Sequence, residues 1–408
     1  MREYHLDLNN PEFVYDPYPL LAELRDTLPV FFDPVWDKVF FTRYEDIAAL
    51  LRDRRLGRSI LHVLSRDELG WPPPNPLTKD FDRFQDDHML DNEPPKHTRL
   101  RSLMVKAFTS SRVDGLRAKI QEVVDELIDR VLDRGRMDLL KDFAEPIPVA
   151  VIAELLGVPE GDRHLLRPWS AKIVKLYELG YTDEQAKAAN QAVVDFSAYL
   201  KDLARQRQKQ PRDDLISALV RVEEQGQVLT MEELVANCIL LLNAGHEATV
   251  NGTTLGMLSL HHNPDQMALA REAAQQNDLE FFKMATEELL RYDTPLPMFE
   301  RWVLQDFDFS GVHLQRGMEV GLLYASGNRD PRRFADPDRL DLTRKDNPHL
   351  TFGLGIHYCI GAPLARIELQ TSFATLLRRL PDIRVAREPV EYTGGFVIRG
   401  HEAMPVEF

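Results

Sequence analysis

Cys359 is the residue of this chain whose surroundings best suit it for chemistry. It lies in the segment FGLGIHYCIG (residues 352–361), directly before a run of helix-forming residues. A cysteine at a helix N-terminus has its thiolate favoured by the helix dipole and by nearby N–H donors. The glycines let the backbone turn tightly and come close to a large, flat group. These features suit a cysteine that acts as a ligand, and neither of them alone is specific to that role.

Other interpretations of the two cysteines have less support. A zinc site needs four ligands, whereas His357 and Cys359 supply at most two, and the chain has no C-x-x-C pattern. A cysteine nucleophile would use His357 as its base. A lone cysteine is most often a small buried hydrophobic residue, and Cys238, in an apolar helical segment, fits that description. Two cysteines cannot form a disulfide scaffold, which favours a reducing compartment.

The segment around Cys359 resembles the haem-ligand loop of the cytochrome P450 family, F-x-x-G-x-(R/H)-x-C-x-G. The fixed positions match at Phe352, Gly355, His357, Cys359 and Gly361. Further family motifs follow in the expected order, namely H-x-x-x-R at His97–Arg101, A-G-x-(D/E) at 244–247, E-x-x-R at Glu288–Arg291, the strand arginine Arg301 and the meander arginine Arg339. The chain is identified as a member of the family over nearly its entire length.

The resemblance implies haem b (iron protoporphyrin IX) as the cofactor, with Cys359 as the ligand of the iron. Thiolate ligation favours cleavage of the O–O bond, and backbone N–H groups of the loop, which includes Phe352 and Gly361, tune the sulfur. The haem propionates need charged donors when they leave water. The residues that match the family's donors are His97, Arg101, Arg301 and His357. Each of them alone could also be an ordinary surface charge.

Glu288, Arg291 and Arg339 have a structural role in the family. Glu288 and Arg291 are three residues apart and could form an ordinary exposed i,i+3 pair. The resemblance instead implies a buried network, closed by Arg339, behind the cysteine loop. Breaking a buried ion pair costs about 3–5 kcal/mol.

The central helix departs from the family pattern. The family follows its acidic residue with a threonine that helps to deliver protons, whereas here Glu247 precedes Ala248 and then Thr249. One residue is about 100° around a helix, so Thr249 should not point where the family's threonine points. Either the helix unwinds near Gly245 so that Thr249 reaches the site, or water or a substrate hydroxyl replaces the alcohol. Glu247 and Thr249 are the candidate proton-delivery residues, with Glu247 the link to solvent.

Family position also predicts which residues face the substrate. A buried amide needs a partner, so Asn243 is expected to meet a polar group of the substrate. Ordinary core packing is the alternative for each of these residues. The predicted substrate contacts are Leu240, Asn243, Ala244 and Ala248 on the central helix, and Leu296, Pro297, Met298 and Val397 on strands opposite.

The site residues named above require a scaffold that positions them. We expect a mainly α fold with small β-sheets that forms a single domain over residues 1–408. A capping box at Thr230 and Glu233 opens a helix from Met231 to about His262, roughly 48 Å long and apolar nearly all round, so it should be buried. Residues 61–95 are expected to be poor in helix. Strand patterns are short and lie near the ends, at 39–42, 301–304, 319–324 and 396–398.

Composition narrows the class of protein. The chain has 408 residues, with 50 basic and 65 acidic side chains, so the net charge is 50 − 65 = −15. This balance argues against nucleic acid or an anionic membrane as the main partner. No apolar run approaches the roughly 20 residues of a membrane helix, and the first ten residues lack a secretory signal. We expect a soluble, cytoplasmic protein without a membrane anchor.

The function implied is a haem-thiolate monooxygenase that inserts one atom of O2 into a small organic substrate. Because the chain carries no flavin or iron–sulfur motif, its electrons are expected from NAD(P)H through ferredoxin reductase and ferredoxin. Seven basic residues and one acid lie between Lys96 and Lys119, a segment that could attract an acidic ferredoxin or simply be a solvated helix face. One alternative is a peroxide-dependent peroxygenase or decarboxylase, and the presence of Glu247 argues against it. The other alternative is a non-catalytic haem-binding sensor. The sequence does not name the substrate.

Overall fold

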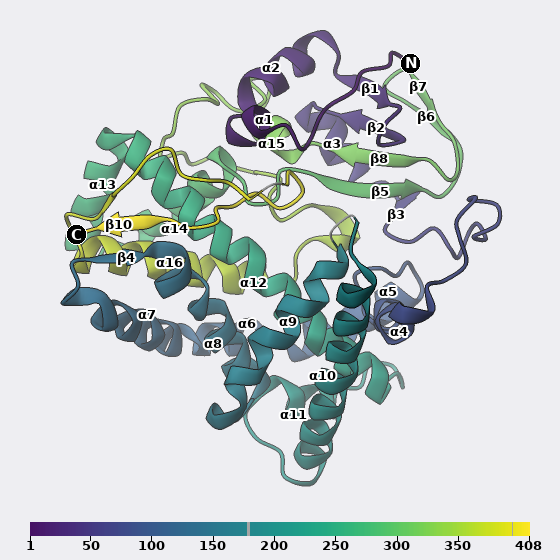
Figure 1. Ribbon diagram of the computed structural model, residues 1–408, viewed down its shortest axis with the longest axis horizontal. Coiled ribbons are helices and arrows are strands. Elements are labelled where there is room, and N and C mark those ends of the chain that lie inside the picture. The colour runs from purple at the N-terminus through teal and green to yellow at the C-terminus, as the bar shows by residue number, and fades with distance from the viewer. Residues whose placement is uncertain (178–179, 394) are drawn as a thin grey trace. The chain divides into compact units, whose positions relative to one another are not determined.

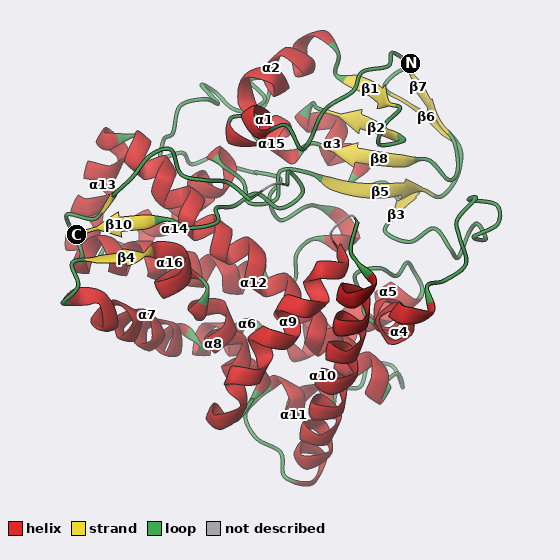
Figure 2. Cartoon of the chain, in the orientation of Figure 1, coloured by secondary structure: helices red, strands yellow, loops and turns green. Residues whose placement is uncertain are grey.

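Helices dominate the fold, and short strands form small sheets (Figures 1 and 2). The computed structural model describes residues 1–177, 180–393 and 395–408. Its α-helices are α1 (Pro11–Tyr15), α2 (Tyr18–Thr27), α3 (Tyr44–Leu50), α4 (Lys79–Asp87), α5 (Lys96–Ala107), α6 (Ser110–Gly115), α7 (Arg117–Leu132), α8 (Pro146–Leu156), α9 (Leu166–Val174), α10 (Asp183–Lys209), α11 (Leu215–Leu219), α12 (Met231–His262), α13 (Pro264–Gln275), α14 (Leu279–Tyr292), α15 (Tyr324–Gly327) and α16 (Ala362–Arg379).

The remaining elements are short. Tighter or wider helical turns are η1 (Pro76–Thr78), η2 (Leu139–Ala144), η3 (Glu160–Leu165), η4 (Lys175–Tyr177) and η5 (Gly355–His357). The strands are β1 (Val30–Asp33), β2 (Lys38–Phe41), β3 (Leu56–Gly57), β4 (Arg136–Asp138), β5 (Phe299–Val303), β6 (Phe307–Phe309), β7 (Val312–Leu314), β8 (Glu319–Leu322), β9 (Arg384–Val385) and β10 (Pro405–Glu407). The prediction of a mainly α fold with small sheets is confirmed.

Two compact units make up the described chain. The first comprises Met1–Val63, Ile120–Pro146 and Glu247–Phe408, and the second comprises Leu64–Lys119 and Ile147–His246. Neither unit is a continuous segment, because the chain passes from one to the other several times. A single domain over residues 1–408 stays a prediction.

The largest sheet belongs to the first unit and has the strand order β1-β2-β8-β5-β3 (Figure 2). β2 and β8 pair in parallel, and the other neighbours are antiparallel. Val39 and Phe41 on β2 and Val320 and Leu322 on β8 are fully buried, and they pack in one core cluster with Leu350 of the segment that leads to Cys359. The hydrophobic core therefore fixes both the strand that carries Arg301 and the start of the cysteine loop.

The strand predictions are correct in three places and wrong in one. The predicted strands at 39–42, 301–304 and 319–324 correspond to β2, β5 and β8, each with ends shifted by a few residues. The strand predicted at 396–398 is wrong, because these residues form a bend. Phe396 is nevertheless buried and packs on Phe13, with ring centroids 4.6 Å apart. The apolar pattern there reports burial rather than a strand.

The segment 61–95 is less poor in helix than the sequence predicts. It contains α4, whose first turn carries Asp80 and Asp82 near the positive end of the helix dipole. Phe81 and Phe84 are buried on one face of this helix. Two aromatic residues at helical spacing are enough to bury α4 against α10, which it contacts.

The long helix α12 is confirmed at the predicted bounds, Met231–His262. The capping box is present, since the N–H of Glu233 donates to Thr230 Oγ1 (3.1 Å) and the N–H of Thr230 donates to Glu233 Oε2 (3.0 Å). The helix continues through Gly245, so the unwinding considered there is not observed. A Cβ atom on Gly256 would lie 2.5 Å from Cζ of Phe373, so α12 packs closely on α16 at this glycine.

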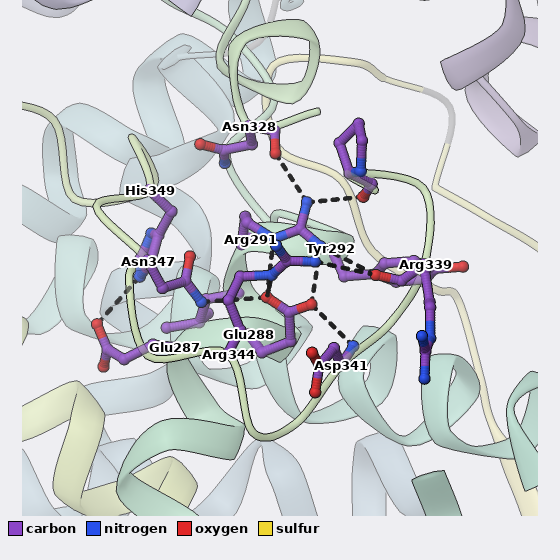
Figure 3. A network of polar contacts seen from close by, with 12 residues as sticks. Glu287, Glu288, Arg291, Tyr292, Asn328, Arg339, Asp341, Arg344, Asn347 and His349 are labelled. Atoms are coloured by element: carbon purple, nitrogen blue, oxygen red, sulfur yellow. Dashed lines mark hydrogen bonds and ion pairs between the residues drawn. The ribbon is translucent and has the colours of Figure 1, made fainter. Parts of the chain in front are cut away.

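A buried ion pair at the end of α14 ties several segments together (Figure 3). Glu288 and Arg291 have no exposed side-chain surface, and two N–H groups of Arg291 donate to the Glu288 carboxylate, each over 2.8 Å. The remaining guanidinium nitrogen, Nη1, donates to the carbonyl oxygens of Asn328 (2.9 Å) and Pro337 (2.8 Å). The pair is therefore the buried network that the E-x-x-R resemblance implies, not an exposed i,i+3 bridge.

The third arginine of this network is Arg344, which corrects the prediction of Arg339. Arg344 Nε donates to Glu288 Oε2 over 3.1 Å. Arg339 is exposed and contributes only its carbonyl oxygen, 3.4 Å from Arg291 Nη2. Both arginines lie in the same irregular segment, and spacing alone does not tell which of them turns inward.

Within this network, the loss of stability caused by a substitution should increase with the burial of the side chain that is removed. We expect Arg291→Ala to leave little folded protein, because Glu288 would remain buried without its main cation, at a cost of about 3–5 kcal/mol. Arg344→Ala should destabilise less, since its side chain is partly exposed, and Arg339→Ala should leave stability near that of the wild type. Soluble yield and thermal unfolding temperature measure the effects. Equal damage from Arg339→Ala and Arg344→Ala would contradict the corrected assignment.

Candidate active site

Cys359 lies in a loop between the 3₁₀ turn η5 and the start of α16. The N–H of Cys359 donates to the carbonyl oxygen of Phe352 (3.0 Å), and the N–H of Tyr358 donates to that of Gly355 (3.1 Å). Gly355 has a φ of +73°, and a Cβ atom on it would lie 2.3 Å from the carbonyl oxygen of Leu51. Only glycine fits this turn, so the loop is held closed both by its own hydrogen bonds and by contact with a distant segment.

The two cysteines have opposite environments. Cys238 is fully buried in α12, and burial raises the pKa of its thiol to about 12. Cys359 is exposed, and its Sγ atom lies 3.8 Å from the position of a Cβ atom on Gly361, the N-cap residue of α16. The positive end of the α16 dipole favours a thiolate at this place. This contrast favours Cys359 as the reactive cysteine and Cys238 as a core residue.

An ion pair that sequence reasoning missed supports the cysteine loop. Arg366 on α16 donates to both carboxylate oxygens of Glu287 (2.7 and 2.8 Å) and to the hydroxyl of Tyr358 (3.1 Å), and its guanidinium lies 4.5 Å from the centre of the Phe352 ring. Burial alone would raise the pKa of Glu287, but hydrogen bonds from His349 and Arg366 lower it to about 2. The carboxylate is therefore ionised and holds both ends of the loop.

The signal for this pair was present in the sequence. Glu287 directly precedes the glutamate of the E-x-x-R motif, so one helix end presents two acidic side chains in succession. Glu288 faces the network with Arg291 and Arg344, whereas Glu287 faces His349 (Figure 3). Arg366 also donates to Glu287.

The predicted propionate residues fall into two pairs, one in each compact unit. In the first unit, Arg301 on β5 is 4% exposed and donates to the carbonyl oxygen of Glu300 (2.8 Å), and His357 is half-buried on η5. In the second unit, His97 is buried and Arg101 is half-buried on α5. They are four residues apart and therefore share one face of that helix. The role of all four residues toward a propionate stays a prediction.

One face of α12 is exposed within a helix that is otherwise largely buried. Ala244 and Ala248 are exposed and four residues apart, so they share a side of the helix, whereas Thr249 is 6% exposed. Glu247 is half-buried. Thr249 therefore points away from the face that Ala248 presents, as helix geometry predicts.

Thr249 has a partner that sequence reasoning missed. Its side chain is hydrogen-bonded to the carboxyl group of Glu368 on α16, which is 2% exposed. Burial raises the pKa of Glu368 to about 8, and the bond to Thr249 lowers it only in part. No described residue satisfies Glu368 Oε1. The carboxyl group thus carries a proton at neutral pH. An acidic residue within the apolar stretch 362–377 was the available signal.

Asn243 is the most informative of the predicted substrate contacts. It is 5% exposed, and its Oδ1 atom accepts a hydrogen bond from Ser170 Oγ on α9 (2.7 Å). Its Nδ2 atom has no hydrogen-bond partner among the described residues. Leu240, one turn earlier on α12, is also buried. Asn243 therefore offers a buried N–H donor, as expected of a group that meets a polar ligand.

The predicted contacts outside α12 differ from one another. Met298 is 1% exposed and packs in a core cluster with Phe31 and Phe40, which favours the core alternative for this residue. Pro297 is buried and Leu296 is half-buried beside a core cluster. Val397 is 44% exposed and lies in the bend at 396–398. Their contact with a substrate stays a prediction.

The basic segment between Lys96 and Lys119 is largely paired within the second unit. Arg99 is hydrogen-bonded to the Glu233 carboxylate, and Lys96 lies 3.7 Å from Asp87. Two further ion pairs are Arg112–Asp213 (3.7 Å) and Arg117–Asp114 (3.4 Å). These pairs favour the interpretation of this segment as an ordinary helix face over that of a free basic surface.

Among the described residues, no helix combines the length and the apolar character that a membrane span needs.

Comparisons with known proteins agree with this architecture. A family model described as Cytochrome P450 matches residues 164–381. The polyketide biosynthesis cytochrome P450 PksS of Bacillus subtilis (strain 168) is 36% identical over 97% of this chain and 96% of its own length. The cytochrome P450 monooxygenase PikC of Streptomyces venezuelae is 38% identical over 97% and 92%. A solved structure of P450BioI with a hexadec-9Z-enoic acid-ligated acyl carrier protein superposes with a TM-score of 0.88 at 35% identity, covering 98% of this chain and 99% of that one.

Haem-thiolate proteins bind iron through a cysteine thiolate, which must be accessible to the haem. Cys359 meets this requirement, and the buried cation Arg301 in the same unit suits a haem carboxylate. The residues present therefore fit the cofactor. The chain belongs to the cytochrome P450 family. It is accordingly a haem b oxidoreductase that incorporates oxygen into small organic substrates.

The assignment of the iron ligand can be tested with the two cysteines as matched variants. We expect the reduced carbon-monoxide adduct of the wild type to show the strongly red-shifted absorption band of a thiolate-ligated haem. Cys359→Ser should abolish this band, because a serine hydroxyl does not replace the thiolate. Cys238→Ser should keep it, since Cys238 is buried in α12. Loss of the band in Cys238→Ser alone would contradict the assignment.

Proposed function

We propose that the protein is a cytoplasmic monooxygenase that hydroxylates or similarly oxidises an organic substrate with electrons from NAD(P)H, delivered by ferredoxin reductase and ferredoxin. The observation that carries the proposal is the exposed Cys359 at the N-terminus of α16, in a chain similar throughout its length to named monooxygenases. A thiolate-ligated haem supplies the activation of O2. In this proposal the electrons reach the haem from these partner proteins.

The haem is held by residues of several segments in this proposal. Cys359 ligates the iron, and Phe352 and Gly361 shape the loop around the sulfur. Arg301, His357, His97 and Arg101 are the proposed donors to the propionates. Buried Arg301 suits this role because a carboxylate taken out of water needs a charged donor.

Proton supply is the step in which this chain departs from its family. Glu368 is the proton donor of the proposal, because its carboxyl group is buried and protonated at neutral pH. Its hydrogen bond to Thr249 gives that hydroxyl a role that helix position alone does not. In this proposal Glu368 gives its proton to the oxygen of Thr249 as Thr249 gives its own hydroxyl proton to water. Glu247, which is half-buried and directly precedes Ala248, links the site to solvent.

The substrate of the proposal is a hydrophobic molecule with oxygen functions, such as a polyketide lactone or an acyl chain. Leu240, Ala244 and Ala248 give an apolar face, and the buried Nδ2 of Asn243 donates to a carbonyl or hydroxyl oxygen. A substrate hydroxyl beside Ala248 can replace the alcohol that the family supplies from threonine. Similarity to the polyketide biosynthesis cytochrome P450 PksS, and to P450BioI in complex with a fatty-acyl carrier protein, supports this class of substrate.

An isotope experiment tests the reaction. Candidate compounds are first ranked by the haem absorption shift that they cause on binding, with macrolide lactones, free fatty acids and acyl carrier protein thioesters in the panel. We expect NADPH, ferredoxin reductase and ferredoxin to support product formation that incorporates one ¹⁸O atom from ¹⁸O2. Product formed equally well from hydrogen peroxide, without label from ¹⁸O2, would favour the peroxygenase alternative and contradict the proposal.

Coupling of electrons to product tests the proton path. We expect Glu368→Gln to slow product formation roughly 10²-fold and to raise peroxide release per NAD(P)H consumed, because an amide cannot give up a proton. In the wild type, coupling should fall as pH rises through about 8, where Glu368 loses its proton. The variant should show no such step.

Two further variants separate the two acids. Thr249→Val keeps the size of the side chain and removes the hydroxyl, so it should uncouple the reaction as Glu368→Gln does. Glu247→Gln should uncouple it at every pH without removing the step near pH 8. A step near pH 8 that survives in Glu368→Gln would contradict the role of Glu368.

A further inference from the structure

Tyr324 carries a buried hydroxyl that the protein leaves unsatisfied. Its side chain is 1% exposed at the start of α15, and its ring packs in the core cluster of the large sheet. The Oη atom is buried, and no described residue forms a hydrogen bond with it. A buried donor without a partner is costly, so native proteins keep one mainly where a partner arrives from elsewhere.

The hydroxyl of Tyr324 points at the loop that carries the iron ligand. A Cβ atom placed on Gly353 would lie 3.7 Å from Tyr324 Oη. Gly353 is in the segment 352–361 and has a φ of +65°. Glycine at this position therefore leaves the backbone of the loop open beside the phenol.

Two arginines act electrostatically on the same hydroxyl. Burial raises the pKa of Tyr324, and the positive charges of Arg301 and Arg58 act to lower it. Both also donate to one carbonyl oxygen, that of Glu300, over 2.8 Å from Arg301 and 3.1 Å from Arg58. Both lie over the ring of Phe299, at 5.1 and 4.3 Å from its centre.

The acidic side chains of this region share one lysine. Glu300 and Glu319 both pair with Lys38. Burial and the charge of Glu300 raise the pKa of Glu319 to about 7, against the opposing effect of Lys38 and Arg58. Two partly buried guanidinium groups and a hydroxyl donor together suit an anion with two oxygens.

We propose that Tyr324 and Arg58 join Arg301 in holding one propionate carboxylate of the haem, with the phenol donating to one oxygen. The position of Tyr324 Oη beside Gly353 favours the haem over any other carboxylate, since the same loop carries Cys359. The inference rests on the haem cofactor of the proposed function and adds two anchoring residues that none of the family motifs in the sequence indicated.

Haem release measures this anchoring without turnover. The rate of haem transfer from the ferric protein to excess apomyoglobin is compared for the wild type and Tyr324→Phe. We expect Tyr324→Phe to release haem about tenfold faster, because it loses one hydrogen bond to a charged group. Arg58→Gln should also accelerate release. Tyr44→Phe is the matched control, since Tyr44 belongs to the same core cluster and its hydroxyl donates to a backbone carbonyl, that of Pro348 (2.7 Å).

Reconstitution with haem dimethyl ester, which lacks free carboxylates, separates anchoring from general loosening. With this haem, Tyr324→Phe and the wild type should release at equal rates, and Tyr44→Phe should differ from the wild type by the same factor with either haem. Equal acceleration of both haems in Tyr324→Phe would mean a structural hydroxyl and would overturn the proposal. So would an unchanged release of native haem.

A third outcome concerns the source of the carboxylate. If Tyr324→Phe leaves haem release unchanged but weakens the spectral binding of a fatty acid, the site serves a substrate carboxylate, and the proposal is wrong. Failure of the proposed function would show differently, as a missing red-shifted band in the reduced carbon-monoxide adduct of the wild type itself.

Discussion

The cysteine loop depends on the burial of the ion pair between Glu288 and Arg291. Two charges taken out of water must be satisfied completely, so Nη1 of Arg291, which does not pair with Glu288, donates to carbonyl oxygens on segments far away in sequence. Among these acceptors is the carbonyl oxygen of Asn328. The side chain of Asn328 in turn accepts from the N–H of Leu350 (2.7 Å). The network thus fixes the backbone that leads into the segment 352–361.

The same helix end stabilises the loop from a second side. Glu287 remains ionised despite burial because Arg366 and His349 donate to it, and Arg366 continues to Tyr358 and to the ring of Phe352. The two adjacent glutamates therefore have different roles. Glu288 fixes the segment before the loop, and Glu287 fixes the loop to α16. This division explains how a surface-accessible Cys359 can sit on a rigid backbone.

The motifs predicted which elements exist better than which side chains turn inward. The bounds of α12 and the burial of Glu288 and Arg291 followed from periodicity, capping residues and family spacing. The choice of Arg344 over Arg339 did not follow, because both lie in an irregular segment whose side-chain directions depend on tertiary packing. Phe396 shows the same limit, since an apolar residue signals burial whether its backbone is a strand or a bend.

Three buried residues of the proposed sites carry polar groups that the protein itself does not satisfy. Glu368, Tyr324 and Asn243 are each nearly fully buried, and each keeps at least one polar atom without a partner among the described residues. Arg291 shows that this fold can satisfy a buried charge completely where only structure is at stake. Tyr324 lies beside the Cys359 loop, Asn243 on α12 and Glu368 on α16. Their unpaired polar atoms are therefore best explained by partners that the chain does not supply: a haem carboxylate for Tyr324, an oxygen of the substrate for Asn243 and water for Glu368.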